Sequence, residues 1–165
     1  MRLTGALLIT AAGLLAGLRA AGGLRAAALR RDSLCKMLAL LEFELGRFHT
    51  PLPEMFADLA ARTDGAGASL CRRMTTGLTG LGEQALGEIW LYALEELPAR
   101  ERDILRPLGQ VLGRYGAQEQ LQALTLCRRD MEQARDEART KARERSSIYA
   151  GLAASAGAVC AVLLL

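Results

Sequence analysis

The sequence predicts an all-α protein. We expect a long antiparallel helical hairpin with N- and C-terminal membrane anchors and a six-helix-type cytoplasmic bundle. Of the 165 residues 51% are hydrophobic, yet only 4% are aromatic and only four are proline. Leu and Ala supply most of the apolar set, and both favour helices over strands. Two uncharged runs lie near the ends of the chain, at residues 3–18 and 148–165, and apolar residues between them recur at steps of three and four.

The two uncharged runs predict membrane anchors. Residues 148–165 would rise about 27 Å as a helix, close to the roughly 30 Å thickness of the hydrocarbon layer. Residues 3–18 are shorter, but Ala20 and Ala21 extend them. We therefore expect an N-terminal transmembrane anchor at residues 1–21 and a C-terminal one at residues 148–165. Residues 22–147 would form a cytoplasmic helical bundle and stalk.

Basic residues lie on the inner flank of each run. Arg19 and Arg25 follow the first run, while Arg143 and Arg145 precede the second. The positive-inside rule then places the residues between the runs in the cytoplasm. A cleaved secretory signal is the alternative for the first run, but Arg19 stands where an uncharged cleavage region is expected. The sequence leaves open whether the N-terminal segment is ever cleaved.

Small residues inside the runs predict close helix packing. Gly13 and Gly17 form a GxxxG pair, and Gly151 with Ser155 forms a related pair of small residues. Such pairs let helices approach closely in a membrane. The pattern is common by chance in segments rich in Gly and Ala, so it is a weak signal.

Heptad spacing predicts that the two long helices pack lengthwise against each other. The stripe of the first helix is interrupted only by Arg31 and consists of Leu24, Ala27, Arg31, Leu34, Leu38, Leu41, Leu45 and Phe48. The last helix is expected to open near Ala117. Its stripe consists of Ala117, Leu121, Leu124, Cys127, Met131, Ala134, Ala138 and Ala142.

Four shorter helices are predicted between the long ones. Thr50 and Pro51 suit the start of the first, which should end at 64–65. The second is expected at about residues 68–78 and the third at 83–97, with Trp90 in the core. The fourth is expected at 99–115, where Pro107 should bend the helix or break its first turns.

No residue pattern predicts catalysis, a cofactor or a metal. The four cysteines form no CxxC pair, and His49 is the single histidine, so a zinc site is poorly supported. No phosphate-binding loop is present, so the chain is not expected to bind ATP itself. A thiol triad of His49, Asp58 and Cys35 or Cys71 would need these residues close together, which nothing in the sequence predicts. The net charge of +3 is too small and too evenly spread to predict nucleic-acid binding.

Several short motifs resemble one known family. Residues 50–54 read TPLPE, residues 105–113 read LRPLGQVLG, and Trp90 is the single tryptophan. With the terminal runs, these features resemble the stage III sporulation protein AB family over essentially the whole chain. The positions that carry the resemblance are Pro51, Leu52, Pro53, Trp90, Asp103, Leu108, Gly109, Leu112, Gly113 and Gln120.

The resemblance implies a role in sporulation. Members are mother-cell membrane proteins of the secretion-like channel apparatus between mother cell and forespore. Their bundle is similar to that of the platform protein of type II secretion and type IV pilus machines. A non-catalytic scaffold is therefore expected, with a cytoplasmic secretion-type ATPase and other sporulation membrane proteins as partners. A platform for a different secretion or pilus-assembly machine remains open, as does a membrane-tethered enzyme.

Overall fold

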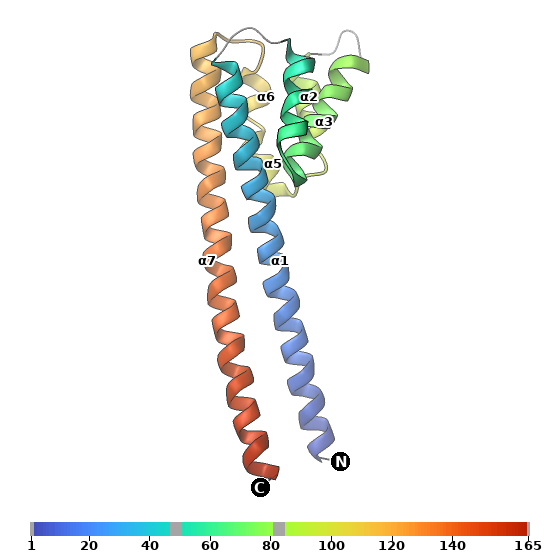
Figure 1. Ribbon diagram of the computed structural model, residues 1–165, viewed down its shortest axis with the longest axis vertical. Helices are drawn as coiled ribbons and strands as arrows, with labels where there is room; N and C mark the ends of the chain where they lie inside the picture. Colours follow the sequence, from blue (N-terminus) through green and yellow to red (C-terminus); the bar gives the residue numbers. More distant parts are fainter. Residues whose placement is uncertain (1, 47–50, 81–84, 165) are drawn as a thin grey trace. The chain divides into compact units, whose positions relative to one another are not determined.

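The structure is a computed structural model that describes residues 2–46, 51–80 and 85–164. The side chains of residues 2–18, 20–21, 80, 146–147 and 149–164 lie outside the described part. The described residues form seven helices and no strand (Figure 1), which confirms the predicted all-α class. The helices are α1 (Arg2–Leu45), α2 (Leu52–Arg62), α3 (Gly65–Gly80), α4 (Leu86–Ala93), α5 (Ala99–Leu105), α6 (Leu108–Val111) and α7 (Ala117–Leu164).

The chain divides into two compact units. One unit joins the first part of α1 to the last part of α7, residues 1–28 and 136–165, and the other is the bundle of residues 29–135. Within the first unit α1 continues as a helix through the exposed pair Gly22 and Gly23. Ala138 and Ala142 are buried there, as their stripe predicted.

The predicted membrane anchors are not supported by the described residues. Among those residues, no helix carries a stretch that is both long and apolar enough to cross a bilayer. The side chains of residues 3–18 and 149–164 lie outside the described part. The predicted small-residue pairs of Gly13 with Gly17 and of Gly151 with Ser155 lie there too.

The bundle is organised on an apolar seam between α1 and α7. Its buried residues are Leu34, Leu38, Leu41, Leu124, Cys127, Met131 and Ala134. Arg128 pairs with Glu42 at 3.0 Å and Arg135 with Asp32 at 3.6 Å. The later residue of α7 thus pairs with the earlier residue of α1, so the two helices run in opposite directions. These contacts confirm the antiparallel packing predicted from the heptads.

Helices α2 and α3 pack together beside α1. Helix α2 begins after Pro51 with no side-chain cap, and the predicted cap Thr50 lies outside the described residues. Helix α3 begins three residues earlier than predicted because α1 supplies its cap. The Ser33 hydroxyl of α1 donates to the Asp64 carbonyl (2.5 Å) and accepts from the Gly67 amide (2.8 Å). Gly65 turns the chain here with a φ of +50°.

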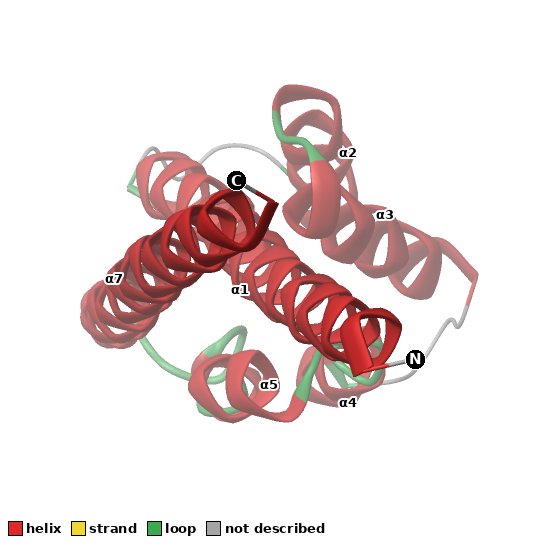
Figure 2. Ribbon diagram, turned by 90° about the horizontal axis from the view of Figure 1, so that it is seen from below, coloured by secondary structure: helices red, strands yellow, loops and turns green. Residues whose placement is uncertain are grey.

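Helices α4 to α6 complete the bundle. The break predicted at Pro107 is confirmed: α5 ends at Leu105, and Pro107 is the N-cap of α6. Because Pro107 has no N–H and its ring opposes a continuous helix, the predicted helix 99–115 becomes two. The described chain therefore has seven helices, where the sequence predicted six. Within the bundle unit, the other helices lie around α1 (Figure 2).

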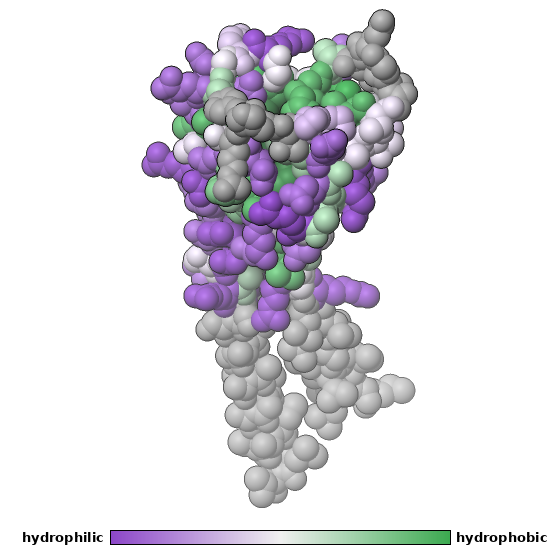
Figure 3. Space-filling view, turned by 45° about the horizontal axis from the view of Figure 1, so that its top comes forward, coloured by the Kyte–Doolittle hydropathy of each residue, from purple (hydrophilic) through white to green (hydrophobic). Residues whose placement is uncertain are grey.

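Polar side chains cover most of the bundle face seen in Figure 3. An apolar area lies near the top of that view.

Candidate functional site

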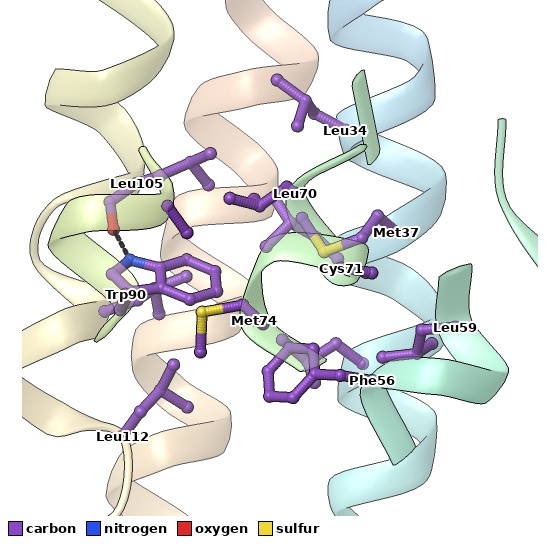
Figure 4. Close-up of a cluster of buried hydrophobic side chains, with 14 of the residues drawn as sticks. Leu34, Met37, Phe56, Leu59, Leu70, Cys71, Met74, Trp90, Leu105 and Leu112 are labelled. Carbon is purple, nitrogen blue, oxygen red and sulfur yellow. Dashed lines mark hydrogen bonds between the residues drawn. The ribbon is translucent and has the colours of Figure 1, made fainter. Parts of the chain in front are cut away.

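The family-like residues that the structure brings together lie at a corner of the bundle made by α4, α5 and α6. Trp90, Leu108 and Leu112 are buried there at 0%, 0% and 3% exposure. The Trp90 indole N–H donates to the carbonyl of Leu105 at 2.9 Å (Figure 4). That carbonyl lies at the end of α5, so the hydrogen bond connects α4 to the end of α5, where Pro107 interrupts the helix. The prediction that Trp90 belongs to the core is confirmed.

Glycines let the corner helices approach one another. A Cβ added at Gly87 would overlap the backbone carbonyl of Gly109, and one at Gly109 would lie 2.9 Å from Cδ1 of Trp90. Gly113 has a φ of +74°, which favours glycine, and its backbone lies over the side chain of Leu86. The glycines of the LRPLGQVLG run therefore have packing roles.

The corner is continuous with the main core. Figure 4 shows Met74 of α3 between the rings of Trp90 and Phe56, with Leu70 and Cys71 nearby. All five side chains are 2% exposed or less. Helix α3 also meets α4 at Gly77, where an added Cβ would overlap Cγ2 of Ile89.

A buried ion pair joins the corner to both long helices. The Glu101 side chain of α5 is 1% exposed, and its Oε1 accepts from Nε of Arg31 at 2.9 Å. Arg31 Nη1 also donates to the carbonyl of Ala134 on α7 at 2.8 Å. The second carboxylate oxygen, Oε2, is buried and has no hydrogen-bond partner among the described residues. Arg31, the polar interruption of the heptad stripe, thus connects α1, α5 and α7.

Of the groups considered for a thiol triad, the structure describes Asp58, Cys35 and Cys71, and it also describes Cys127. Burial raises the pKa of the Cys71 thiol to about 12 and that of Cys127 to about 11, so both are protonated at neutral pH. A protonated thiol is a poor nucleophile. Asp58 pairs with Arg62 at 2.9 Å on the surface of α2, and His49 lies outside the described residues.

A half-open pocket lies between α1, α3 and the end of α4. Arg30, Ser69 and Arg73 lie in its wall, with Leu70 among its apolar residues. Arg73 pairs with Glu96 and donates to the carbonyl of Ala93 at 3.3 Å. These contacts give Arg73 a structural role at the edge of the pocket.

The remaining family-like residues are distributed around the bundle. Pro51 is exposed at the start of α2, with Leu52 and Pro53 half-buried behind it. Asp103 is exposed on α5. Gln120 donates from Nε2 to the Tyr115 carbonyl at 2.6 Å and so closes the turn before α7. These positions do not form one site with Trp90.

Sequence reasoning missed the residues whose partners are far away in the chain. Glu101 looks like an ordinary first-turn acid after Pro98, and Ser33 looks like a polar residue beside the stripe. Arg31 was the one available signal, because a lone Arg in an apolar stripe needs a buried partner. Gly87 carried no signal, since only its contact with Gly109 gives it a role.

Together the fold and the corner define a class: a helical bundle built around two long antiparallel helices, with a tightly packed core at its corner. The chain belongs to the stage III sporulation protein AB family, whose model matches residues 2–165. A solved structure of "Stage III sporulation protein AB (SpoIIIAB)" is similar to it, with a TM-score of 0.63. That match covers 69% of this chain and 94% of the other at 20% identity, and it supports the fold. No curated protein matches the sequence.

Proposed function

We propose that this sporulation protein is a non-catalytic membrane scaffold of a secretion-like apparatus, and that it presents its bundle to a cytoplasmic secretion-type ATPase. The observation that carries the proposal is the ion pair of Arg31 with Glu101. It connects both long helices to the corner of short helices, so a load on the bundle would pass directly to α1 and α7. Ion pairs of Glu42 and Asp32 with arginines of α7 add to the connection.

The membrane part of the proposal rests on the uncharged runs and their basic flanks. The mother-cell membrane is the proposed location, with the bundle on the cytoplasmic side. Protease added from either side of sealed membranes would test this at Thr63 and Asp64, between α2 and α3. Cleavage only from the cytoplasmic side is expected, and cleavage only from the opposite side would overturn the orientation. Recovery of the whole chain in the soluble fraction would overturn the membrane location.

Binding to the motor can be measured with purified components. The full-length chain in detergent or nanodiscs is mixed with the secretion-type ATPase of the same sporulating cells. Binding or a change in ATPase assembly or rate is expected. If the folded chain neither binds the ATPase nor alters it, the proposed mechanism loses its main support.

The enzyme alternative makes an opposite genetic prediction. A scaffold should still support sporulation when His49, Asp103 and the cysteines are all replaced by Ala. Loss of spores with normal folding of that variant, checked by circular dichroism, would favour an enzyme.

A further inference from the structure

We propose that the outward face of α4 is a docking surface for a partner protein helix that carries a large apolar residue between basic residues. Four side chains make this face: Glu88, Leu91, Tyr92 and Glu95. Their spacing of three, one and three residues places them on one side of α4 and its following turn, over about 10 Å. The proposal builds on the scaffold role above but does not depend on which protein is the partner.

The face exposes two large apolar side chains on the side of α4 that points away from the core. Tyr92 is 72% exposed and Leu91 41%, while Ile89, Trp90 and Ala93 on the opposite side of α4 are buried. Helix α4 thus already has a core-facing side. An exposed Tyr beside an aliphatic residue is typical of the centre of a protein interface, where aromatic anchors contribute much of the binding energy.

The acids at each end of the face set the chemistry of the partner. Glu88 and Glu95 are exposed and form no ion pair among the described residues. Three other acids of the bundle, Glu42, Glu44 and Asp58, are paired with arginines. Two unpaired acids around an apolar centre complement Lys or Arg placed around an apolar residue, and such complementarity favours one partner over others.

The same charges argue against other kinds of ligand. Anionic lipid headgroups attract basic segments and nucleic-acid phosphates attract Lys and Arg, so Glu88 and Glu95 would repel both. A basic protein segment remains the best match to the face.

The face is also held rigidly. Gly87 lies against Gly109, Ile89 against Gly77, and the Trp90 N–H is bonded to the Leu105 carbonyl, so α4 is fixed on its inner side. A pre-ordered surface loses little conformational entropy when it binds a partner.

Crosslinking in sporulating cells tests the proposal. The full-length chain carries a photoreactive p-benzoylphenylalanine in place of Tyr92, and crosslinked peptides are sequenced by mass spectrometry. The expected product is another protein, crosslinked at a segment with Lys or Arg within about one helical turn on both sides of a large apolar residue. The same photoreactive residue at Leu126, which is 60% exposed on α7, is the position control and should not capture that segment.

Charge reversal then tests the recognition. The double substitution E88K/E95K should lower the crosslink yield about ten-fold or more, because two attractions become repulsions. Replacing the partner's flanking basic residues with Glu should restore the yield. The matched control E54K/D130K reverses two acids elsewhere on the surface and should leave the yield unchanged.

Several outcomes would overturn the proposal. They are no crosslink from position 92, a crosslink only to lipid or to a second copy of this chain, an acidic or uncharged captured segment, and a yield unaffected by E88K/E95K. If the captured basic segment belongs to a protein other than the ATPase, the docking surface stands, and the binding measurement with purified components decides whether the ATPase is a partner as well. If the ATPase binds the chain but position 92 captures no basic segment from any protein, the ATPase stands as a partner and the docking surface falls.

Discussion

The seam between α1 and α7 and the corner of α4 to α6 are packed by different means. In the seam, Leu34 and Leu38 of α1 and Leu124 and Met131 of α7 are buried in one apolar cluster, with ion pairs between the two helices. In the corner, α4, α5 and α6 have only eight, seven and four residues, and they approach so closely that only glycine fits at position 87. A regular seam tolerates variation in side-chain shape, because any apolar residue of similar size can fill it. The corner depends on individual residues, and its substitutions should therefore have the largest effects.

The largest loss of stability is expected from Trp90→Ala. It removes the largest buried side chain of the corner and leaves the Leu105 carbonyl without its donor. Truncation of a buried Trp to Ala costs about 3–5 kcal/mol. Urea unfolding of the purified chain, followed by circular dichroism, measures the change. Trp90→Phe is the milder comparison, and equal stability of both variants and the native chain would show that the corner does not contribute to the fold.

A loss of about 3 kcal/mol is expected from Arg31→Met, because the buried Glu101 would lose its nearer cation and keep only the half-exposed Arg30 at 3.8 Å. The double variant R31M/E101L removes both charges and should recover most of that loss, since apolar replacements of buried pairs are often neutral. The same unfolding experiment on R31M, on the single variant E101L and on the double variant gives the coupling free energy. If the losses of stability in the two single variants add up to the loss in the double variant, the pair is not coupled.

The free energy of unfolding should depend on pH through the two buried thiols. Cys71 and Cys127 have raised pKa values in the folded state, about 12 and about 11, so the folded chain holds these protons more tightly than the unfolded one. Their contribution is complete below the unfolded pKa near 9 and is lost as pH rises from there toward 11–12. The free energy of unfolding should fall by about 2–3 kcal/mol between pH 8 and pH 10. In C71A/C127A this part of the fall should disappear, and an unchanged slope would contradict the assigned burial.

A smaller loss, about 2 kcal/mol, is expected from Gly87→Ala, because the new Cβ would overlap the Gly109 carbonyl and force the backbones apart. Gly22→Ala is a matched control in α1, where no atom lies within 4 Å of the new Cβ. Alanine there should stabilise the helix by about 0.5–1 kcal/mol. Opposite signs are therefore expected for the same substitution, and thermal unfolding would detect them. Equal effects at both positions would contradict the close approach at Gly87.

The comparison also separates what the sequence can predict from what it cannot. Heptad spacing predicted the seam, and Pro107 predicted the break between α5 and α6, because both act through local geometry. The approach of Gly87 to Gly109 and the burial of Glu101 depend on how short helices cross, which no local pattern encodes. The early start of α3 was missed for the same reason: its cap is Ser33, which lies on another helix.

The candidate site was predicted in part. Trp90, Leu108, Gly109 and Leu112 were identified through the family resemblance, and the structure gathers them at the corner. Asp103 and Gln120 were identified in the same way, but Asp103 is on the exposed side of α5 and Gln120 lies in α7, so neither belongs to the buried group. The family resemblance identifies positions in the sequence but not the distances between them in the structure, so it could not separate these two groups of residues.

Spore yield in cells that carry the Arg31 and Glu101 variants tests the central claim most directly. A structural scaffold needs the connection between its long helices and its corner, and it needs no chemistry from the ion pair itself. We predict that R31M lowers the number of heat-resistant spores and that R31M/E101L, with its stability restored, returns it to the native level. A double variant that folds as stably as the native chain but yields no spores would contradict the account.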